Sequence, residues 1–428
     1  MTDPQDANTQ LGGPRAWIIW SLTALAFGYA FFQRVAPSTM VQELMAEFAI
    51  GAAVTGTLSA LYFYPYFLLQ IPLGVLIDRW GARLLLTGAL SVAGLGSVLF
   101  ASASTIEIAY LGRFLIGVGS AVGFLGSLAI AAKWFRPDQF AFLAGMVMLF
   151  GMMSGVFAQG PLAALVIGFG WRPALWGLGL SGIALALLIF LIVRDSPADG
   201  DTLKPAKDSW AQTWKNFCKA VSSKTVWKIA FLAAAMSGPM LTIGGLWGVP
   251  YLQSAYGLDK TSAAATTSFI LFGWAVCAPF AGWFSDRIKK RKPLLVSGSF
   301  ALSCILAILI FANNLPLFVT IILFALIGST GAFMSITFAL VREVSAPHIS
   351  ASVTGIVNSM TVASGALLQP VVGLILDSVW SGEMRNDIPV YEAGDFQTGF
   401  IAIFTVCVLG FLTSLMLEET PVWTKATP

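Results

Sequence analysis

Charged residues are scarce in this sequence of 428 residues. Only 11% of them are Asp, Glu, Lys or Arg, against about 25% in a typical soluble domain. By contrast, 57% are hydrophobic, and the mean hydropathy is +0.81. A chain with so little charge cannot cover a surface that faces water, so we expect lipid to be its main solvent. The net charge is only +3 and no basic patch contains interleaved aromatic residues, so we expect no binding to nucleic acid.

Residues that bind metals or form catalytic groups are also few. His348 is the only histidine, and the four cysteines (Cys218, Cys277, Cys304 and Cys407) have neither disulfide-framework nor metal-site spacing. No pairing of a nucleophile with a base is visible, and no Gly-x4-Gly-Lys-Ser/Thr phosphate loop occurs. We therefore expect no metal, no cofactor, no enzymatic activity and no use of ATP within this chain.

Long apolar runs dominate the sequence. Twelve of them reach or approach the 20 or so residues that a membrane-spanning helix needs. The first run follows a polar stretch and is long enough to span, so we expect it to remain as an anchor rather than a cleaved signal peptide. The runs are 16–36, 51–77, 84–103, 106–133, 139–166, 171–193, 226–255, 262–285, 293–312, 315–341, 350–376 and 397–417.

The centres of these runs contain no Asp or Glu. The acids closest to them fall at predicted helix ends, as Asp78, Asp286, Glu343 and Asp377 do. Proton symporters usually place a titratable carboxylate along the transport path. The absence favours facilitated transport, or coupling to a co-transported ion or through an acid at a helix end.

An internal repeat divides the chain into two halves. The charged stretch Gly74–Arg83 (GVLIDRWGAR) recurs in degenerate form at Gly282–Arg291 (GWFSDRIKKR), 208 residues later. A second pair, Ser154–Gln159 (SGVFAQ) and Ser364–Gln369 (SGALLQ), has an offset of 210. Two matches at nearly one offset indicate a duplicated unit of six helices. We predict a tail (1–15), a six-helix bundle (16–193), a linker (194–225), a second bundle (226–417) and a tail (418–428).

Positive charge gives the orientation. With the N-terminus in the cytosol, 19 of the 24 Lys and Arg residues fall on cytosolic ends and loops, as the positive-inside rule demands. Both termini and the linker are then cytosolic. Within the linker, apolar residues at helical spacing predict an amphipathic helix on the inner leaflet, the alternative being a solvated linker. These residues are Trp210, Trp214, Phe217 and Val221, with Lys215 and Lys219 between them.

The charged stretch resembles the loop motif of the major facilitator superfamily, which follows the second helix of each half. The resemblance implies an all-α fold of twelve transmembrane helices in two pseudo-symmetric halves, and transport by alternating access. It also implies a conformational latch, although simple topological anchoring is an alternative. Ala82 departs from the motif where a basic residue is usual. The latch residues would be Gly74, Asp78, Arg79, Gly81 and Arg83, with Gly282, Asp286 and Arg287 in the second copy.

Two further stretches resemble superfamily motifs. Arg113, followed by Gly117 and Gly119, resembles the fourth-helix arginine that takes part in proton transfer in some members. The alternative is an interfacial arginine whose head reaches outward. The segment 62–74 is similar to bacterial relatives of the lysosomal dipeptide transporter and of intraphagosomal amino-acid carriers.

Arg34, at the end of the first span, is the sharpest indication of a substrate. An arginine near the bilayer is costly and usually faces a cavity or a partner. Its guanidinium can hold a carboxylate through two parallel hydrogen bonds. The position also resembles the first-helix arginine of superfamily branches that carry organic anions. The alternative is an arginine at the outer interface.

Other polar and aromatic residues share helix faces with spacings of three or four residues. Amides at lipid depth need partners, so those in the predicted spans should face protein or a wet cavity. Aromatic stripes also fit ordinary packing, and that alternative stays open. The candidates for substrate binding are Tyr29, Gln33, Arg34, Tyr62, Tyr66, Gln159, Trp247, Tyr251, Asn358 and Gln369.

We therefore predict a secondary transporter for a small carboxylate-bearing solute, such as an organic anion, an amino acid or a dipeptide. The alternatives are a drug or metabolite exporter, whose cavity usually carries embedded carboxylates, and a receptor built on the same fold. We expect a monomer in the bacterial inner membrane, with the lipid bilayer and the solute as its partners.

The latch motif gives a first testable prediction. Asp78→Asn should slow transport, because losing the carboxylate unbalances the inward-open and outward-open states. Uptake into vesicles and accessibility labelling of cavity positions would measure both effects. Wild-type kinetics together with unchanged labelling would contradict a latch role.

Overall fold

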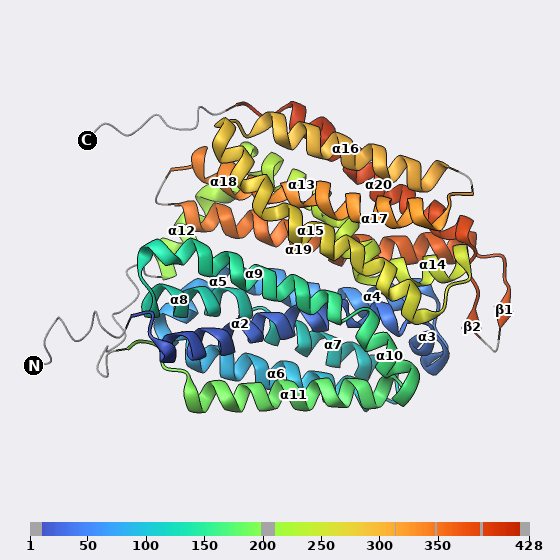
Figure 1. Cartoon of the computed structure of the whole chain (residues 1–428), viewed down its shortest axis with the longest axis horizontal. Coiled ribbons are helices and arrows are strands. Elements are labelled where there is room, and N and C mark those ends of the chain that lie inside the picture. Colours follow the sequence, from blue (N-terminus) through green and yellow to red (C-terminus); the bar gives the residue numbers. More distant parts are fainter. Residues whose placement is uncertain (1–10, 198–209, 313, 347–348, 386–387, 420–428) are drawn as a thin grey trace, which may run out of the picture. The chain divides into compact units, whose positions relative to one another are not determined.

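The computed structural model describes residues 11–197, 210–312, 314–346, 349–385 and 388–419, and this part of the chain is almost entirely helical (Figure 1). It contains 12 helices that are long and apolar enough to cross a membrane. The predicted all-α class and the predicted number of spans are therefore confirmed. The spans are Pro14–Thr39, Ala52–Gln70, Ala82–Ala101, Ile106–Trp134, Phe142–Phe169, Trp171–Ile192, Lys224–Tyr256, Lys260–Ile288, Lys292–Phe311, Leu317–Glu343, Ser352–Val379 and Ala393–Leu415.

The described chain contains the following helices, several of which meet end to end, and all but α3 and α12 contribute to the spans. The α-helices are α2 (Pro14–Val35), α3 (Val41–Phe48), α4 (Ala52–Ala60), α5 (Phe63–Trp80), α6 (Ala82–Ala101), α7 (Ile106–Ser120), α8 (Gly123–Trp134), α9 (Phe140–Phe157), α10 (Gly160–Phe169), α11 (Trp171–Ile192), α12 (Trp210–Val221), α13 (Lys224–Pro239), α14 (Gly248–Tyr256), α15 (Lys260–Ile288), α16 (Lys292–Phe311), α17 (Leu317–Gly331), α18 (Ile336–Glu343), α19 (Ser350–Val379) and α20 (Ala393–Leu415).

Short elements complete the described chain. The 3-10 turns η1 (Ala36–Thr39), η2 (Pro137–Gln139) and η4 (Ala332–Ser335) join helices, and η3 (Met240–Trp247) is a π-helical stretch between α13 and α14. The strands β1 (Met384–Arg385) and β2 (Ile388–Pro389) pair antiparallel, with Met384 opposite Pro389.

Helix breaks within spans occur where the sequence permits them. The fifth span changes from α9 to α10 at Ala158–Gln159, and Gly160–Pro161 then begins α10. Proline fits the first turn because its missing N–H would have no helical partner there. Non-helical backbone at membrane depth is tolerated only where protein or a wet cavity surrounds it. These breaks therefore mark places where side chains have to satisfy the backbone.

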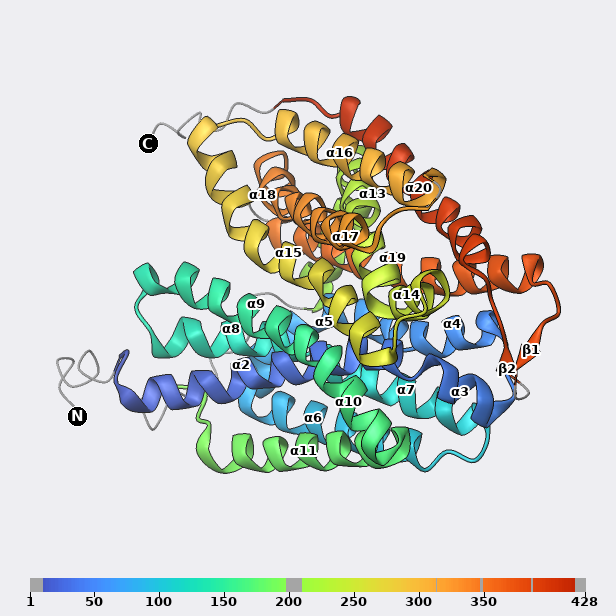
Figure 2. The same cartoon turned by 45° about the vertical axis from the view of Figure 1, so that its right-hand side comes forward.

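By its internal contacts the chain forms two compact units. Unit 1 comprises Met1–Ala36 and Tyr64–Trp210, and unit 2 comprises Pro37–Phe63 and Ala211–Pro428. In unit 1, α6 packs along α11 and α7, while α2 packs against α9 and α8. In unit 2, α15 packs on α17, α13 on α19, and α16 on α20 (Figure 2). Segment Pro37–Phe63 belongs to the first half of the sequence but packs with unit 2.

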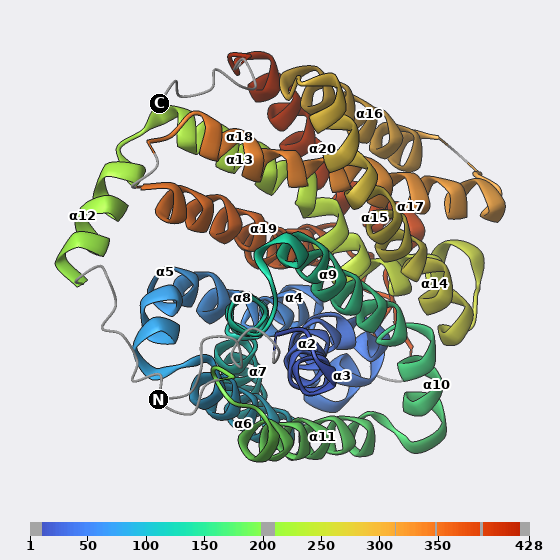
Figure 3. The same cartoon turned by 60° about the vertical axis from the view of Figure 1, so that its left-hand side comes forward.

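The linker contains a helix where an amphipathic one was predicted. Helix α12 leads into α13 (Figure 3), and Lys215 and Lys219 on it are exposed whereas Ala220 is buried. The side chains of Trp210 and Trp214 lie outside the described part of the structure. The helix itself is thus found, and its place on the inner leaflet stays a prediction.

Glycines set the closest helix crossing of unit 2. A Cβ on Gly328 of α17 would overlap the carbonyl oxygen of Ile270 on α15, and one on Gly273 would overlap that of Ala325. Without a hydrophobic drive between helices in lipid, close packing of small residues provides much of the association. The α15–α17 pair is therefore held by backbone contact along reciprocal glycines.

Gly328→Ala should destabilise the protein by about 1–3 kcal/mol, because the added methyl group forces α15 and α17 apart. Thermal unfolding of the detergent-purified protein would measure the loss. Gly355→Ala is the matched control, since a Cβ on Gly355 would meet nothing within 4 Å. Equal melting temperatures for the two variants would contradict this account of the crossing.

Candidate functional site

Arg34 lies in the last turn of α2 and is buried, with 6% of its surface exposed. Its guanidinium lies over the rings of Phe31 and Tyr66, 4.7 Å and 4.9 Å from their centroids. Desolvated cation–π contacts of this kind are worth about 2 kcal/mol. The burial disagrees with the alternative of an arginine at an exposed interface. It places the positive charge among aromatic faces instead.

A second arginine supports the same helix end. Arg113 of α7 is 1% exposed, and its Nη1 donates to the carbonyl oxygen of Gln33 at 2.9 Å. An outward-reaching arginine would be exposed, so that alternative is not what the structure has. The cation stabilises the C-terminal end of α2, where free carbonyls carry partial negative charge. A role for Arg113 in coupling stays a prediction.

Gln33 and Tyr29 extend this network to α11. Gln33 Nε2 donates to Tyr29 Oη at 2.8 Å, and that hydroxyl donates to the carbonyl oxygen of Leu178 at 3.2 Å. Gln33 is fully buried, and its Oε1 has no hydrogen-bond partner among the described residues. A buried acceptor without a partner costs about 1–3 kcal/mol. The sequence-predicted residues Tyr29, Gln33, Arg34 and Tyr66 are thus brought together in unit 1.

In unit 2, Gln369 makes the polar contacts to the π-helical stretch. Its side-chain Nε2 donates to the carbonyl oxygen of Leu241 at 2.8 Å. Its backbone carbonyl oxygen accepts from Trp247 Nε1 at 3.1 Å. Gln369 is fully buried, and its Oε1 also has no partner within the described ranges. Single-turn π-bulges occur frequently at functional sites. The stretch itself carries no signal that sequence spacing could have detected.

The aromatic candidates of unit 2 pack in a cluster. The rings of Trp247 and Tyr251 lie 6.4 Å and 6.2 Å from that of Phe396, and Tyr251 also lies 5.4 Å from Phe400. Both candidates are buried. Edge and tilted geometries of this kind stabilise cores. The geometry supports the packing alternative, and contact of these rings with a substrate stays a prediction.

Three candidates remain, and each lies at a different kind of position in the helices. Tyr62 is buried where α4 gives way to α5, with its ring 5.3 Å from that of Phe63. Gln159 is buried at the N-cap of α10, and Asn358 is half-buried on α19. Gln159 and Gln369 match in the repeat, but the first stands at a helix break and the second inside a continuous helix.

The first copy of the charged motif is organised by Asp195, which sequence reasoning missed. Gly81 has φ +81, and a Cβ there would lie 2.5 Å from Asp195 Oδ2. Asp195 Oδ1 accepts from the backbone N–H of Arg83 at 3.0 Å, while the Arg83 guanidinium donates twice to the carbonyl of Phe190. Arg79 is exposed. Gly74 and Asp78 lie in α5, but their side chains are outside the described part of the structure.

The second copy is organised by Arg291. Its guanidinium contacts Asp286 at 2.6 Å and Glu343 at 2.9 Å. Burial lowers the pKa of Arg291, but the hydrogen bonds with the two carboxylates outweigh it, so the pKa lies above its ordinary value. Arg287 lies over the Trp283 ring at 5.3 Å, and Gly282 is half-buried. Asp286, a predicted latch residue, is thus engaged within its own unit.

The described residues contain no candidate metal-binding cluster. Among the described residues there is no group of three or more His, Cys, Asp or Glu side chains that could hold a metal ion.

Proteins with similar sequences are named for the transport of several kinds of solute. The chain is 24% identical over 290 residues to a probable sulfoacetate transporter of Cupriavidus necator, covering 64% of this chain and 66% of that protein, just under two thirds of its length. It is 26% identical over 314 residues to a quinolone resistance transporter of Acinetobacter baumannii (62% and 72%). It is 25% identical over 424 residues to a probable L-galactonate transporter of Escherichia coli (92% and 87%).

The fold recurs in a solved transporter structure. An inward-facing, occupied bacterial homologue of the human lysosomal transporter Spinster matches with a TM-score of 0.76, 17% identity, and coverage of 95% of this chain and 97% of that one. At this identity the match shows the fold alone.

The sequence itself matches the Major Facilitator Superfamily over residues 22–370 and again over 229–427, so that nearly every described span is included. Together with the twelve membrane-length helices, this agrees with what the charged motif implied. The chain belongs to the Major Facilitator Superfamily and is a multi-pass membrane transport protein.

Proposed function

We propose that this chain is a secondary transporter that moves a small carboxylate-bearing solute by alternating access, with Arg34 as the group that binds the carboxylate. The observation that carries the proposal is a guanidinium that is buried and placed over two aromatic rings. Such a group recognises a planar anion through its fork of donors. In an exporter of lipophilic cations, a buried positive charge would repel the solute.

The surroundings of Arg34 support a small polar solute. Next to it on α2, the buried Oε1 of Gln33 can accept a hydrogen bond that no described residue supplies. A solute whose carboxylate binds Arg34 and whose hydroxyl or amine donates to this oxygen would satisfy Gln33. Two relatives are named as probable transporters of sulfoacetate and of L-galactonate, and both of these solutes bear a carboxylate.

The distribution of basic residues supports the orientation. We place both termini and α12 in the cytosol of a bacterial inner membrane, because 19 of the 24 basic residues then face inward. Span ends at α4 and α19 then meet on the outer side, together with the hairpin β1–β2.

Arg34→Ala should abolish binding of the carboxylate solute while leaving the protein folded. Truncating one partner of a buried charge pair costs about 2–5 kcal/mol, or about 30-fold or more in affinity. Arg34→Lys should recover only part of the loss, since an ammonium keeps the charge but not the planar fork.

Thermal shift of the detergent-purified protein would test this, with monocarboxylates, dicarboxylates, sulfonates, amino acids and dipeptides as ligands, because binding to the folded state raises the melting temperature. Arg172→Ala is the matched control, since Arg172 is another unit 1 arginine that bonds a helix-end carbonyl, that of Ala101. A carboxylate that stabilises wild type and Arg34→Ala equally would remove Arg34 from the site. Stabilisation by lipophilic cations alone would favour the exporter.

A further inference from the structure

Segment Pro37–Phe63 connects two parts of unit 1 but packs on unit 2. Helix α2 precedes it and α5 follows it, and both belong to unit 1, whereas α4 packs along α19 and α3 contacts β2. A change in the relation between the units must therefore either release this segment from α19 or bend the chain at its ends. The chemistry of the contact decides between these outcomes.

Asp377, at the C-terminal end of α19, caps the N-terminus of α4. Its Oδ1 accepts from the backbone N–H of Ala52 and its Oδ2 from that of Ala53, both at 2.9 Å. The local N-cap residue of α4 is Gly51, which has no side chain to do this. The first N–H groups of a helix have no helical partner and attract negative charge. An acid 325 residues away thus supplies the cap that the local sequence lacks.

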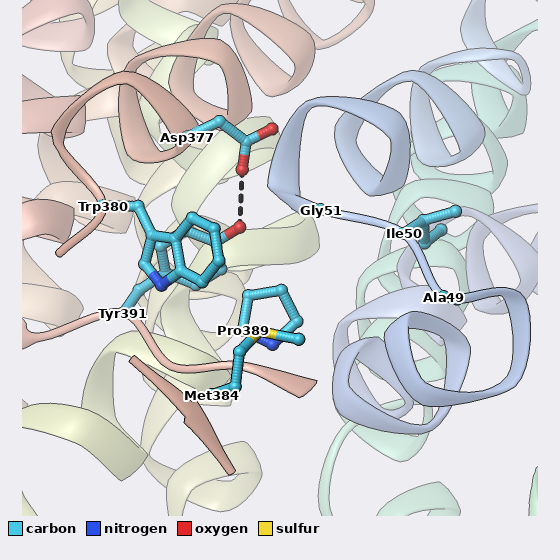
Figure 4. Close-up of a pocket in the computed structure, with 8 residues that line it drawn as sticks. All are labelled: Ala49, Ile50, Gly51, Asp377, Trp380, Met384, Pro389 and Tyr391. Atoms are coloured by element: carbon cyan, nitrogen blue, oxygen red, sulfur yellow. Dashed lines mark hydrogen bonds between the residues drawn. The ribbon is translucent and has the colours of Figure 1, made fainter. Parts of the chain in front are cut away.

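Tyr391 completes the cap. Its hydroxyl donates to Asp377 Oδ1 at 2.5 Å (Figure 4). The same hydroxyl accepts from the N–H of Ala52 at 3.0 Å. Burial, and next the hydrogen bond with Asp377, raise the pKa of Tyr391, so it remains a protonated donor at neutral pH. These groups line one side of a pocket of about 330 Å³, beside Trp380, Met384 and Pro389.

Next to the cap, glycines allow α4 and α19 to approach each other closely. A Cβ on Gly51 would lie 2.9 Å from Asp377 Oδ1, one on Gly56 would lie 2.5 Å from the carbonyl oxygen of Gln369, and one on Gly373 would overlap that of Ala52. Glycine is needed at all three positions for this approach. At Gly56 and Gly373 the nearest atoms across the contact are backbone atoms, so at these two points no side chain has to change its rotamer for the helices to separate.

A second charged contact holds the same segment at another element. Glu43 of α3 pairs with the ammonium of Lys260 at the start of α15, and both side chains are largely buried. Segment Pro37–Phe63 is therefore bonded to α15 and to α19 by separate charges. Two independent polar contacts on one segment argue against an accidental meeting of helix ends.

The sequence around Asp377 repeats that around Asp78. Gly373–Asp377 reads GLILD, and Gly74–Asp78, at the end of the second span, reads GVLID. In each case a glycine precedes by four residues an aspartate that ends the apolar part of a span. The ends of these two apolar runs therefore share a sequence pattern, and at Asp377 the group that the carboxylate contacts is the N-terminus of α4.

We propose that Asp377 is a gating residue of the transport cycle, whose cap on α4 holds the outer side shut and is released whenever that side opens. The gating role rests on the proposed function, since only a transporter needs to open this contact. Hydrogen bonds to a carboxylate suit this task because water replaces them with little net change in free energy. When the cap is released, the glycine contacts between α4 and α19 separate as well.

Accessibility labelling tests the proposal without any substrate. The reporter is Thr55→Cys in a background without the four native cysteines, because Thr55 lies on α4 below the cap and is 1% exposed. Asp377→Ala should raise its labelling rate with a membrane-impermeant maleimide, added outside, by about tenfold or more. Tyr391→Phe, which removes one donor, should raise it less.

Asp259→Ala is the matched control. Asp259 also caps a helix at this end, but it caps its own helix α15, through the N–H of Ser262 at 3.0 Å. In the Asp259→Ala variant, the labelling rate of the Thr55→Cys reporter should stay at the value measured without that substitution. Wild-type labelling in both Asp377→Ala and Tyr391→Phe would overturn the proposal, and so would an equal rise in Asp259→Ala, since that would indicate general loosening.

Cross-linking tests the need for release. Glu43→Cys with Lys260→Cys, joined by a short bifunctional methanethiosulfonate, should stop uptake, and reductant should restore it. Full uptake with the cross-link in place would overturn the proposal, because the segment would then not need to move. The labelling result stands even if carboxylates prove not to be the solute, so the two failures are distinguishable.

Discussion

The structure depends on how helix ends are satisfied in a medium without water. Each span leaves N–H groups at its start and carbonyls at its end, and lipid offers them no partner. Arginines of unit 1 donate to carbonyls near the ends of neighbouring helices. These contacts join Arg113 to Gln33 of α2, Arg172 to Ala101 of α6, and Arg83 to Phe190 of α11.

Carboxylates do the converse at helix starts. Asp195 caps α6 in unit 1, and Asp377 caps α4 in unit 2. Glu419 accepts from the N–H of Arg291, which precedes α16. A chain with only 11% charged residues thus uses several of its charges to bond the ends of helices other than their own. This use follows the sign of the helix dipole, with anions at helix starts and cations at helix ends.

The same rule explains what the sequence could and could not predict. Apolar runs give the spans directly, since hydrophobic length is a local property, and all twelve appear in the described chain. Arg34 was also detectable, because a charge near the end of an apolar run is rare. The caps by Asp195 and Asp377 were not, since each depends on an element far away in sequence. Nor was the π-helical stretch, whose carbonyl on Leu241 is satisfied by Gln369 from α19.

The packing of segment Pro37–Phe63 escaped prediction for a related reason. The repeat assigns it to the first half, and periodicity says nothing about which unit a short span contacts. Gly51 and Gly56 are small residues within the segment, but a glycine does not by itself indicate which helix packs against it. In the structure Gly51 and Gly56 of the segment face α19, and Gly373 of α19 faces the start of α4.

Two glycine-lined helix pairs in unit 2 differ in the way that matters for motion. The α15–α17 crossing brings Gly273 and Gly328 against the backbone carbonyls of Ala325 and Ile270, and the ion pairs found among the described residues do not join these two helices. The α4–α19 contact ends in a carboxylate, a hydroxyl and helix N–H groups, all of which water can solvate. In both pairs the backbones approach closely. Only the second pair ends in polar groups that water can solvate, which lowers the free energy needed to separate its helices. On this argument the first pair is a permanent part of unit 2, and the second is the one suited to being made and broken.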